Sequence, residues 1–390
     1  MNSKFTQHHR SSGMIENDIR KLSQKSTHNS DHIDGSSLVR FQENATEPNP
    51  ENINMSSYVA LRNTSVETTR VLTTTFTTLS TSASTTIKHV RIIRGELYPQ
   101  DRNLPMCPKR PPNLVGPISA LLEPVPLTEI IAMYPGLGSG GRGAPKHCFA
   151  RHRVAIVVAY REKVTQLNVF LRNIHTLMRK QQHDYAVLAI TQIKNQTFNR
   201  GKLYNIGFLE SVLRYPFDCV IFHDLDFLPI NDKNMYSCPT KPRHMAVAVD
   251  KWNFKLPRDD YFGGVVALSR VQFEVINGYS NQFWGWGGED DELFLRIKYA
   301  RIKYTRASPL VARYTAIKHK YAEEDPTQNS TCREKLIEAC RSRYLNDGLS
   351  DLEYREVLVT IKNHYYLITV DLLEERAKLK LKNEGICDDF

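Results

Sequence analysis

The chain has 390 residues, of which 41% are hydrophobic and 24% are charged, and its formal net charge is +10 at pH 7. This length allows one large or two ordinary domains with a sizeable core. The positive charge suits a phosphate-bearing substrate, but the lysines and arginines are scattered and form no nucleic-acid-binding motif, so no nucleic-acid partner is expected.

Cysteine and asparagine patterns favour a secretory route. The seven cysteines include no Cys-x-x-Cys pair, which disfavours a zinc ribbon. Five Asn-x-Ser/Thr sequons favour an oxidising compartment, where disulfide bonds persist. They begin at Asn44, Asn54, Asn63, Asn195 and Asn329. In conflict with this route, the sequence has neither an apolar run of about 18 residues nor the apolar core of a signal peptide.

The first 100 residues lack the pattern of a folded domain. They are polar, and residues 73–86 are mostly Thr and Ser, as in an extended stalk. No sustained period of 2 or 3.6 residues occurs in this part of the sequence. We therefore predict a disordered, Ser/Thr-rich stem over residues 1–100 and one folded domain over residues 101–385.

Strand and helix patterns alternate beyond residue 150. Residues 154–160 form a continuous, mostly β-branched apolar run, which is typical of a buried central strand in a parallel sheet. Further strands are predicted at residues 185–190, 219–222, 245–249 and 310–319. Within residues 261–268, paired glycines precede another apolar strand, so a ligand or a second backbone is expected to approach there. Apolar residues at helical spacing predict helices over residues 167–178 and 203–213. This alternation predicts an α/β domain with a largely parallel sheet flanked by helices.

Asp224 and Asp226 follow the predicted strand at residues 219–222. Ligands bind at the carboxyl ends of strands in such sheets, and the spacing of two turns both carboxylates to one side. Two carboxylates on one face repel unless a cation or a proton lies nearby. One interpretation is a divalent metal that bridges a diphosphate. The other is a turn after a strand, in which Asp is common, and both stay open.

His319 ends the predicted strand at residues 310–319. A single histidine is more often structural or merely exposed than functional. At a strand end, in a domain that also offers Asp224 and Asp226, it is a candidate metal ligand. Aspartate and histidine together suit Mn²⁺ better than Ca²⁺, which prefers oxygen ligands alone.

Residues 281–296 place two tryptophans among glycines, directly before four acids. The acids favour a helix start, because the N-terminus of a helix carries partial positive charge. Glycines beside a tryptophan also suit a mobile loop that closes an aromatic ring over a ligand, next to a carboxylate that takes a proton. The helix start alone leaves the aromatic loop unexplained, so a lid over a sugar site is the functional hypothesis.

Short motifs in the same order resemble those of the metazoan β-1,4-galactosyltransferases, from about residue 107 to residue 371. The matching segments are Phe198-Asn-Arg200, Asp224-Leu-Asp226, Pro242-Arg-His244, Tyr261-Phe-Gly-Gly264, Ile276-Asn-Gly278, Trp284-Gly-Trp-Gly-Gly-Glu-Asp-Asp291 and Asp347-Gly-Leu349. The resemblance implies a GT-A glycosyltransferase fold, with a mixed, mostly parallel central sheet. It also implies Mn²⁺-dependent transfer of galactose from UDP-galactose to a terminal GlcNAc or related sugar of a glycan, in β-1,4 linkage and with inversion.

The resemblance assigns a donor site to several separate segments. Asp226 and His319 would bind Mn²⁺, and Trp286 would close over the UDP-sugar. Tyr261 would crowd an N-acetyl group on the donor, which favours galactose. The residues that would contact the nucleotide-sugar are Ala159, Tyr160, Arg161, Lys163, Phe198, Asn199, Arg200, Leu225, Asp226, Tyr261, Trp286 and His319.

The resemblance makes Asp290 the catalytic base, which would take the proton of the acceptor hydroxyl during a single displacement. The acceptor site would consist of Gly288, Glu289, Asp290, Asp291 and Arg333. Two disulfide bonds are also implied. They join Cys107 to Cys148 and Cys219 to Cys238, whereas Cys332, Cys340 and Cys387 have no partners in the family.

The sequence departs from the family pattern at several site positions. Lys163 replaces an arginine, so it keeps the charge but loses the bidentate fork. Ala316 replaces the methionine of the metal site, three residues before His319, which removes a weak thioether ligand. Arg258 and Glu334 replace aromatic residues of the acceptor pocket, so the acceptor is open beyond a simple GlcNAc.

Two alternative functions stay open, and the resemblance also implies a cellular location. The first alternative is a β-1,4-N-acetylgalactosaminyltransferase that uses UDP-GalNAc, and the second is a sugar-binding homologue with weak catalysis. The family's enzymes are usually type II membrane proteins, so the Golgi lumen and membrane association are expected. The sequence itself shows no transmembrane anchor.

Overall fold

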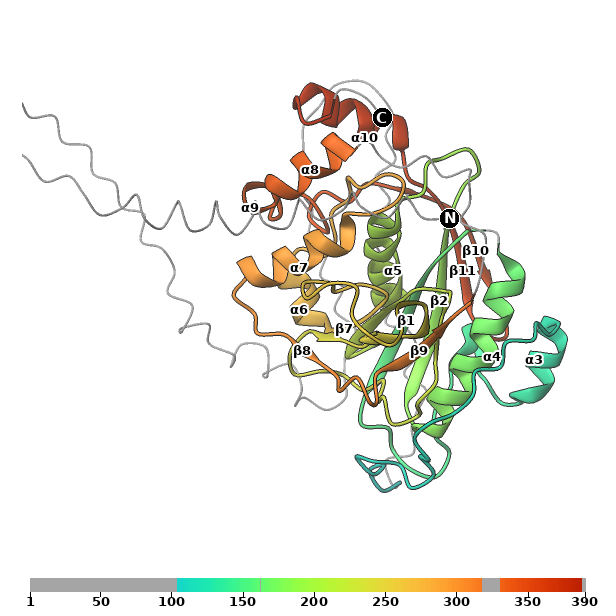
Figure 1. Cartoon of the computed structure of the whole chain (residues 1–390). Coiled ribbons are helices and arrows are strands. Elements are labelled where there is room, and N and C mark those ends of the chain that lie inside the picture. The colour runs from blue at the N-terminus through green and yellow to red at the C-terminus, as the bar shows by residue number, and fades with distance from the viewer. Residues whose placement is uncertain (1–103, 162, 318–329, 388–390) are drawn as a thin grey trace, which may run out of the picture. The chain divides into compact units, whose positions relative to one another are not determined.

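A computed structural model describes residues 104–161, 163–317 and 330–387 of the chain (Figure 1). The predicted stem, residues 1–100, lies outside these described residues. Within the described ranges, no helix is both long and apolar enough to cross a membrane.

The fold is organised around an eight-stranded mixed sheet. In spatial order its strands are β10 (Arg355–Ile361), β11 (Tyr366–Asp371), β2 (Asp184–Gln192), β1 (Arg153–Tyr160), β3 (Cys219–His223), β7 (Val265–Ser269), β5 (Arg243–His244) and β8 (Thr305–Arg306). The four strands from β11 to β3 run parallel to one another. The pairs β10–β11, β3–β7 and β7–β5 are antiparallel, so the parallel strands form the middle of the sheet.

Helices cover both faces of the parallel strands, which explains the continuous apolar run at β1. Val158 packs in the same core as α4 (Val164–Lys180), whereas its neighbour Val157 packs in the core that contains α5 (Arg200–Arg214). Successive residues of a strand point to opposite faces, so a strand buried on both faces needs apolar residues at every position. Figure 1 shows α4 and α5 on either side of β1 and β2.

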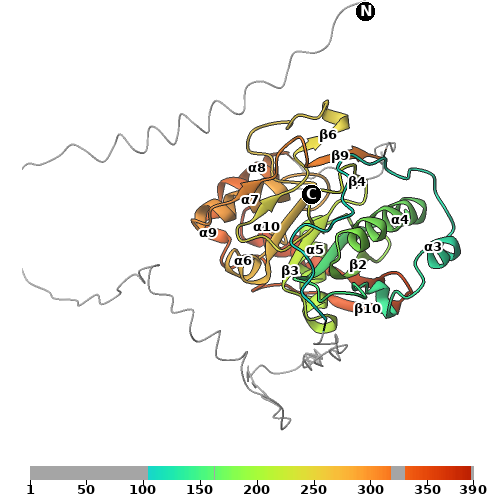
Figure 2. The same ribbon diagram turned by 90° about the horizontal axis from the view of Figure 1, so that it is seen from below.

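A smaller sheet and several shorter helices complete the described structure. The small sheet has the order β4 (Phe227–Pro229), β9 (Arg313–Ala316) and β6 (Ala248–Val249), which lie together in Figure 2. The remaining helices are α3 (Leu127–Met133), α6 (Arg270–Val275), α7 (Glu289–Tyr299), α8 (Ser330–Glu338), α9 (Cys340–Arg343) and α10 (Glu374–Asn383), with the 3-10 helices η2 (Ser139–Gly141) and η3 (Asp250–Trp252).

Two of the predicted strands are wrong in extent. The apolar run at residues 245–249 is not one strand, because β5 ends at His244 and β6 begins at Ala248 in the other sheet. The chain crosses between the two sheets while staying buried, so burial rather than pairing explains its apolar sequence. The strand predicted at residues 310–319 is limited to β9, and residues 318 and 319 lie outside the described ranges.

The starts of two helices lie at the carboxyl ends of the parallel strands of the large sheet. Asp224 directly follows β3, and its backbone N–H donates to the carbonyl of Gly264 at 2.8 Å, which extends the pairing with β7. Arg200 begins α5 and Glu289 begins α7 at this same edge. In open α/β sheets, ligands bind at the carboxyl ends of the parallel strands, so this edge is where a site is expected.

Candidate active site

Arg200 joins three carboxylates from two separate segments. Its Nε donates to Oε1 of Glu289 at 2.6 Å, and its Nη2 donates to Oδ2 of Asp290 at 2.7 Å. Its Nη1 lies 2.8 Å from both carboxylate oxygens of Asp224. The side chains are only 4% to 23% exposed, so water screens these ion pairs weakly. The guanidinium therefore holds the end of β3 against the start of α7.

Asn199 places Arg200 by starting α5 at the right residue. The carboxamide oxygen of Asn199 accepts from the backbone N–H of Lys202 at 2.9 Å, as an N-cap does. Its amide nitrogen donates to the carbonyl of Asn281 at 2.8 Å, where the tryptophan-rich loop begins. Asn199 is fully buried. In the structure, Asn199 therefore positions Arg200 and the tryptophan-rich loop through buried contacts, although the resemblance placed it among the nucleotide contacts.

The four acids at the start of α7 divide between the site and the core. Glu292 is buried and accepts from Arg296 at 2.7 Å, so it belongs to the structural part of the helix. Glu289 and Asp290 bind Arg200, and Asp291 pairs with Arg258. The predicted helix start is therefore present, and the same helix presents three of its acids at the sheet edge.

A buried network fixes α7 to the chain that follows it. Arg296 donates to Glu292 and, at 2.9 Å, to Oδ2 of Asp347. Arg343 binds the same two carboxylates from the other side. Buried charges are tolerated only when they are paired and hydrogen-bonded, as all four are here. Through this network, the orientation of the α7 N-terminus depends on Arg343 of α9 and on Asp347, four residues after it.

The surroundings of Asp290 shift the pKa of its carboxyl towards neutral pH. Burial raises the pKa of its carboxyl to about 7, and the nearby charges of Glu289 and Asp224 also raise it, whereas Arg200 opposes them. Burial also raises the pKa of Asp224, again against the effect of Arg200. A general base works best when its pKa lies near the working pH. Asp290 meets that condition without a histidine.

Gly263 brings the backbone against the Asp290 carboxylate. A Cβ at this position would lie 2.2 Å from Oδ2 of Asp290 and 2.9 Å from the hydroxyl of Tyr261. Tyr261 is held edge-on between Trp252 and His244, at ring-centroid distances of 5.2 and 5.5 Å. The paired glycines predicted to allow a close approach therefore do so, and the tyrosine hydroxyl lies beside the candidate base.

The two tryptophans of the loop have different environments. Trp284 is 1% exposed in the core, whereas Trp286 is 66% exposed. The carbonyl of Phe198 accepts from the N–H of Gly285 at 2.7 Å, which fixes the loop between the two rings. Arg333 lies against the loop and donates to the carbonyl of Trp286 at 3.5 Å. Only Trp286 is therefore available to cover a ligand.

Gly288 lets the loop enter α7 at a sharp angle. Its φ is 98°, and a Cβ there would lie 2.4 Å from the ring of Phe283. Any other residue would be both strained and obstructed at this position. The glycine therefore makes possible the close packing between the loop and the acids of α7.

The segment expected to line the nucleotide lies at the end of β1. Ala159 and Tyr160 are its last residues, and Lys163 stands exposed directly before α4. The guanidinium of Arg161 lies 5.9 Å from the ring centroid of Phe198, within reach of a cation–π contact. These residues therefore lie near the carboxyl end of β1, where the cation of Arg161 faces the ring of Phe198.

The candidate metal position is described only in part. Asp226 follows Leu225 in the turn after β3, and its carbonyl accepts from the N–H of Ile317 at 2.8 Å. His319 lies outside the described ranges, and no group of three potential metal ligands occurs within them. The described chain is thus anchored beside Asp226 as far as Ile317.

The structure contains both disulfide bonds that the resemblance implies, Cys107–Cys148 and Cys219–Cys238. It also joins Cys332 to Cys387, although the family pattern left both without partners. Cys340 is buried and free. The third bond could not be derived from spacing, because its cysteines lie 55 residues apart and no pattern connects them.

Two contacts at the site were not anticipated. The hydroxyl of Tyr204 donates to Oδ1 of Asp224 at 3.0 Å, and its position four residues after Arg200 on α5 is the signal that could have placed it there. Arg258 forms an ion pair with Asp291 as well as with Asp260. The substitution at Arg258 was noticed in the sequence, but its partner on α7 was not.

Two family models match successive parts of the chain. Residues 107–239 match the family model described as the N-terminal region of glycosyl transferase group 7, and residues 243–320 match the one described as the N-terminal domain of galactosyltransferase. Beta-1,4-galactosyltransferase 1 of Homo sapiens is 40% identical over 273 residues, which cover 69% of this chain and 68% of that protein. Beta-1,4-galactosyltransferase 3 of Mus musculus is 40% identical over 279 residues, with coverages of 70% and 69%.

Solved structures with a similar chain include the catalytic domain of Drosophila beta-1,4-galactosyltransferase 7 in complex with xylobiose. It is 28% identical, has a TM-score of 0.49, and the match covers 57% of this chain and 94% of that one. A mutant of the same Drosophila enzyme, in complex with manganese, UDP-Gal and xylobiose, gives the same values. With 40% identity to curated relatives over more than two thirds of their length, the chain belongs to the β-1,4-galactosyltransferase family of glycosyltransferases.

Proposed function

We propose that this enzyme transfers galactose from UDP-galactose to a terminal GlcNAc or related sugar of a glycoprotein or glycolipid glycan, in β-1,4 linkage and with inversion. The observation that carries the proposal is Asp290, a carboxylate with a pKa of about 7 beside Tyr261 and Gly263 at the carboxyl edge of the sheet. The curated relatives named above supply the reaction class.

Inversion by a single displacement requires one base and no covalent intermediate. Asp290 takes the proton of the acceptor hydroxyl as that oxygen attacks the anomeric carbon, opposite the leaving UDP. Arg200 fixes the position of Asp290 relative to Glu289 and Asp224, because its guanidinium binds all three carboxylates. With a pKa of about 7, the carboxyl of Asp290 would accept and release a proton near neutral pH.

Asp226 and His319 would hold the Mn²⁺ ion of the donor complex. Bound there, the ion would lower the negative charge of the departing diphosphate. Ala316 offers no sulfur to the ion, because its side chain is a methyl group. The ligand set is therefore a carboxylate and an imidazole, which suits Mn²⁺ and does not require a thioether.

The nucleotide would lie along Ala159, Tyr160, Arg161 and Lys163, next to Phe198. Arg161 and Phe198 are already in contact, so this part of the site is formed before ligand binds. Trp286 would cover the sugar, since its ring is exposed on a loop flanked by glycines. Closing an exposed ring over the donor would exclude water from the transfer step.

The acceptor would bind between the start of α7 and α8. Gly288, Glu289 and Asp291 come from the first, and Arg333 comes from the second. The ion pair between Arg258 and Asp291 places a cation where the family has an aromatic ring. Acceptor recognition would thus depend on hydrogen bonds and charge more than on stacking.

Tyr261 favours UDP-galactose over UDP-GalNAc as donor. Its ring is fixed by Trp252 and His244, so it does not swing away to admit an N-acetyl group. We place the reaction in the Golgi lumen, since the three disulfide bonds require an oxidising compartment.

The test is Mn²⁺-dependent transfer by the full chain, produced in an oxidising compartment, with UDP-galactose and UDP-GalNAc in parallel and a GlcNAc acceptor. Galactose transfer is expected to dominate. Asp290→Asn should lower kcat by about 10³-fold, because it removes the base, while the affinity for UDP stays near that of the wild type. Wild-type turnover by Asp290→Asn would remove Asp290 as the base. Folded protein that binds UDP but transfers neither sugar would favour the sugar-binding alternative.

A further inference from the structure

Two adjoining cavities lie where the parallel strands of the large sheet begin. This is the opposite end of these strands from the candidate active site. The cavities have volumes of about 250 and 430 Å³, and both are lined by Gln182 and His183, directly before β2. A strand the length of β1 spans about 25 Å, so the cavities are well separated from Asp290.

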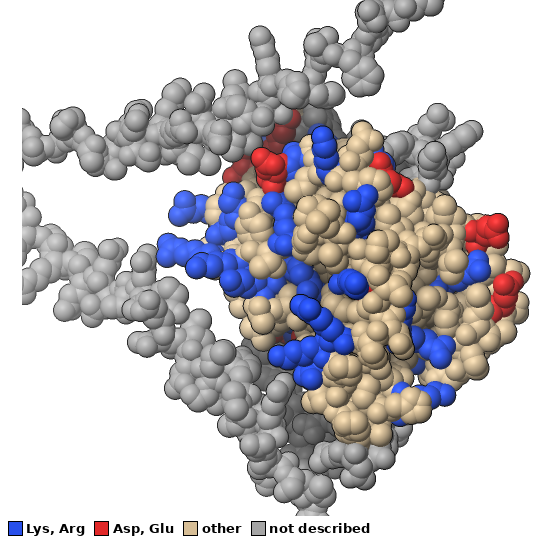
Figure 3. Space-filling view, turned by 60° about the horizontal axis from the view of Figure 1, so that its bottom comes forward, with Lys and Arg blue, Asp and Glu red and all other residues tan. Residues whose placement is uncertain are grey.

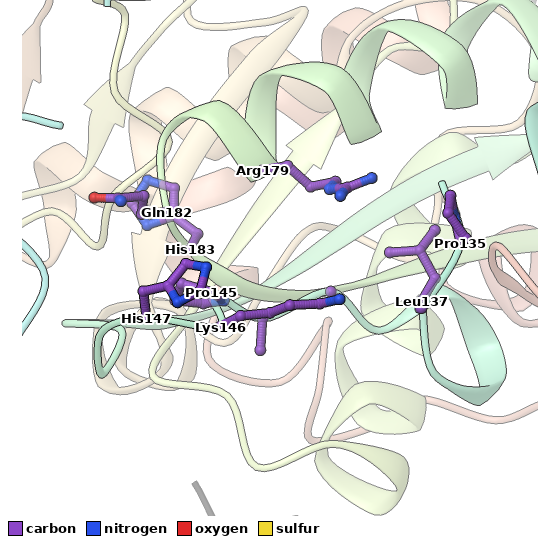
Figure 4. Close-up of a pocket in the computed structure, with 11 residues that line it drawn as sticks. Pro135, Leu137, Pro145, Lys146, His147, Arg179, Gln182 and His183 are labelled. Atoms are coloured by element: carbon purple, nitrogen blue, oxygen red, sulfur yellow. The ribbon is translucent and has the colours of Figure 1, made fainter. Parts of the chain in front are cut away.

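Cations line both cavities. The first, drawn in Figure 4, is lined by Lys146 and Arg179, and the second by Lys109 and Arg151. No Asp or Glu occurs among the described residues that line either one. Figure 3, in which the lower end of Figure 1 comes forward, shows Lys and Arg over much of the described surface, with Asp and Glu mainly near its margins.

Neighbouring carboxylates do not neutralise these cations, because other groups already bind them. Asp184, next to His183, is buried and bonded to Arg142 at 2.9 Å and to the hydroxyl of Tyr215 at 2.8 Å. Asp218 pairs with Arg153 in the same way, at 2.8 Å. These two carboxylates therefore pair with arginines that do not line the cavities.

Two buried polar groups at the cavities lack hydrogen-bond partners among the described residues. They are Nε2 of His183, whose side chain belongs to a residue that is 5% exposed, and Oε1 of Gln182. Burial lowers the pKa of His183 to about 3, so its imidazole is neutral at pH 7 and can donate or accept. A buried polar atom without a partner is unfavourable, and a ligand that bonds to it would remove that cost.

Figure 4 shows how these groups are arranged. Gln182, His183 and His147 gather at one end of the first cavity, and Lys146 and Arg179 extend along its two sides. The ring of Tyr134 lies 5.6 Å from the guanidinium of Arg179, which helps to hold that cation in place. Lys146 and Arg179 therefore lie on either side of the cavity, and the hydrogen-bonding groups of Gln182 and His183 lie at its end.

We propose that the two cavities form a second binding site, for an anionic carbohydrate chain. Its sulfate, phosphate or carboxylate groups bind the four lining cations, and its hydroxyl groups bind Gln182 and His183. The described lining contains no Phe, Tyr or Trp, so it offers no stacking platform for nucleic-acid bases. The site is independent of the transfer reaction and lies at the other end of the strands.

The test uses the full chain and a fluorescent heparin-derived octasaccharide as the probe. Lys146→Gln combined with Arg179→Gln should weaken binding at least fivefold and make it less sensitive to salt, because fewer counterions are released. The matched control is Lys303→Gln combined with Lys382→Gln, which removes the same charge from two exposed lysines on other elements. The control should bind as the wild type does, and both variants should keep their galactosyltransferase activity.

Three results would overturn the proposal. Equal weakening by the two double variants would assign binding to the overall charge of the protein. Competition by UDP-galactose or by a GlcNAc acceptor would place the octasaccharide in the active site. Inorganic phosphate that competes as well as the octasaccharide would show a simple anion site without carbohydrate contacts, whereas weaker binding of the desulfated octasaccharide supports sulfate as the group recognised.

Discussion

Arg200 counteracts the repulsion among three carboxylates that the proposed reaction needs close together. Without its guanidinium, Asp224, Glu289 and Asp290 would repel one another and would retain more protons. Arg200, helped by Arg258, opposes the effect of burial and keeps the pKa of Asp290 near 7. The proposed base therefore depends on a residue that does not itself react.

Removing one like charge should make Asp290 a stronger acid. Glu289 raises the pKa of Asp290, so Glu289→Gln is expected to lower it and to shift the acid limb of the pH profile to lower pH. The sign follows because a base acts when ionised, and a lower pKa keeps it ionised further into acid. The measurement is kcat/KM for the donor against pH, with the wild-type limb expected near pH 7. A limb that moves to higher pH would contradict this electrostatic account.

A methyl group at Gly263 should displace the base without disturbing the fold. Its Cβ would lie 2.2 Å from Oδ2 of Asp290, so that carboxylate must move. Gly263→Ala is expected to lower kcat by about 10²-fold, since a shift of about 1 Å is enough for such a loss. The unfolding temperature should stay near the wild-type value. The control is Gly138→Ala, whose Cβ would make only ordinary contacts at 3.6 Å or more; wild-type kcat in Gly263→Ala would exclude the clash.

Residue roles were predictable from sequence where a motif was contiguous. The acids of α7 and the pair Asp224–Asp226 could be singled out because neighbours in sequence share a strand end or a helix turn. Their common partner Arg200 could not be recognised as a hub, since its carboxylates lie 24 to 90 residues away. The resemblance named these residues, and the structure shows how they contact one another.

The disulfide bond Cys332–Cys387 holds α8 against the end of the chain beyond α10. Phe283, Leu336 and Leu381 pack around it in a small core of their own. This core lies beneath the loop of Trp286 and next to Arg333, so it connects the proposed lid and the proposed acceptor site.

Removing this bond should affect the acceptor more than the donor. Cys332→Ser with Cys387→Ser is expected to lower the free energy of unfolding by about 3 kcal/mol, since the bond closes a 55-residue loop. The KM for the acceptor should rise, because Arg333 is adjacent to Cys332, while the KM for UDP-galactose changes little. Cys107→Ser with Cys148→Ser is the matched control, expected to lose stability with no selective change in the acceptor KM. An equal rise of both KM values in the first variant would exclude a role in acceptor positioning.

Most elements of the fold could be predicted from the sequence, because buried strands and helices have recognisable apolar patterns. The predicted α/β class and the GT-A fold, with a mixed sheet flanked by helices, are confirmed. Strands β1, β2 and β3 were found because both of their faces are covered. The run at residues 245–249 was misread, since a buried crossing between two sheets has the same apolar pattern as a strand.

The whole molecule uses the two ends of its parallel strands differently. Carboxylates gather at the carboxyl ends, where a nucleotide-sugar and a metal ion are proposed to bind. At the amino ends of these strands, the described residues that line the two cavities include four cations and no Asp or Glu. The net charge of +10 gave no indication of this separation, because it sums over the whole sequence. Only the positions of the strand ends reveal it.

The position of β11 has a consequence for how the protein is made. β11 pairs with β2 in the middle of the large sheet, yet its residues emerge from the ribosome long after those of β2. Until then one side of β2 has no partner strand, and an open strand edge readily pairs with other chains. Asp347, which holds α7, also emerges late. The nascent chain therefore exposes this edge of β2 until β11 has been made, and the support of α7 is complete only once Asp347 is in place.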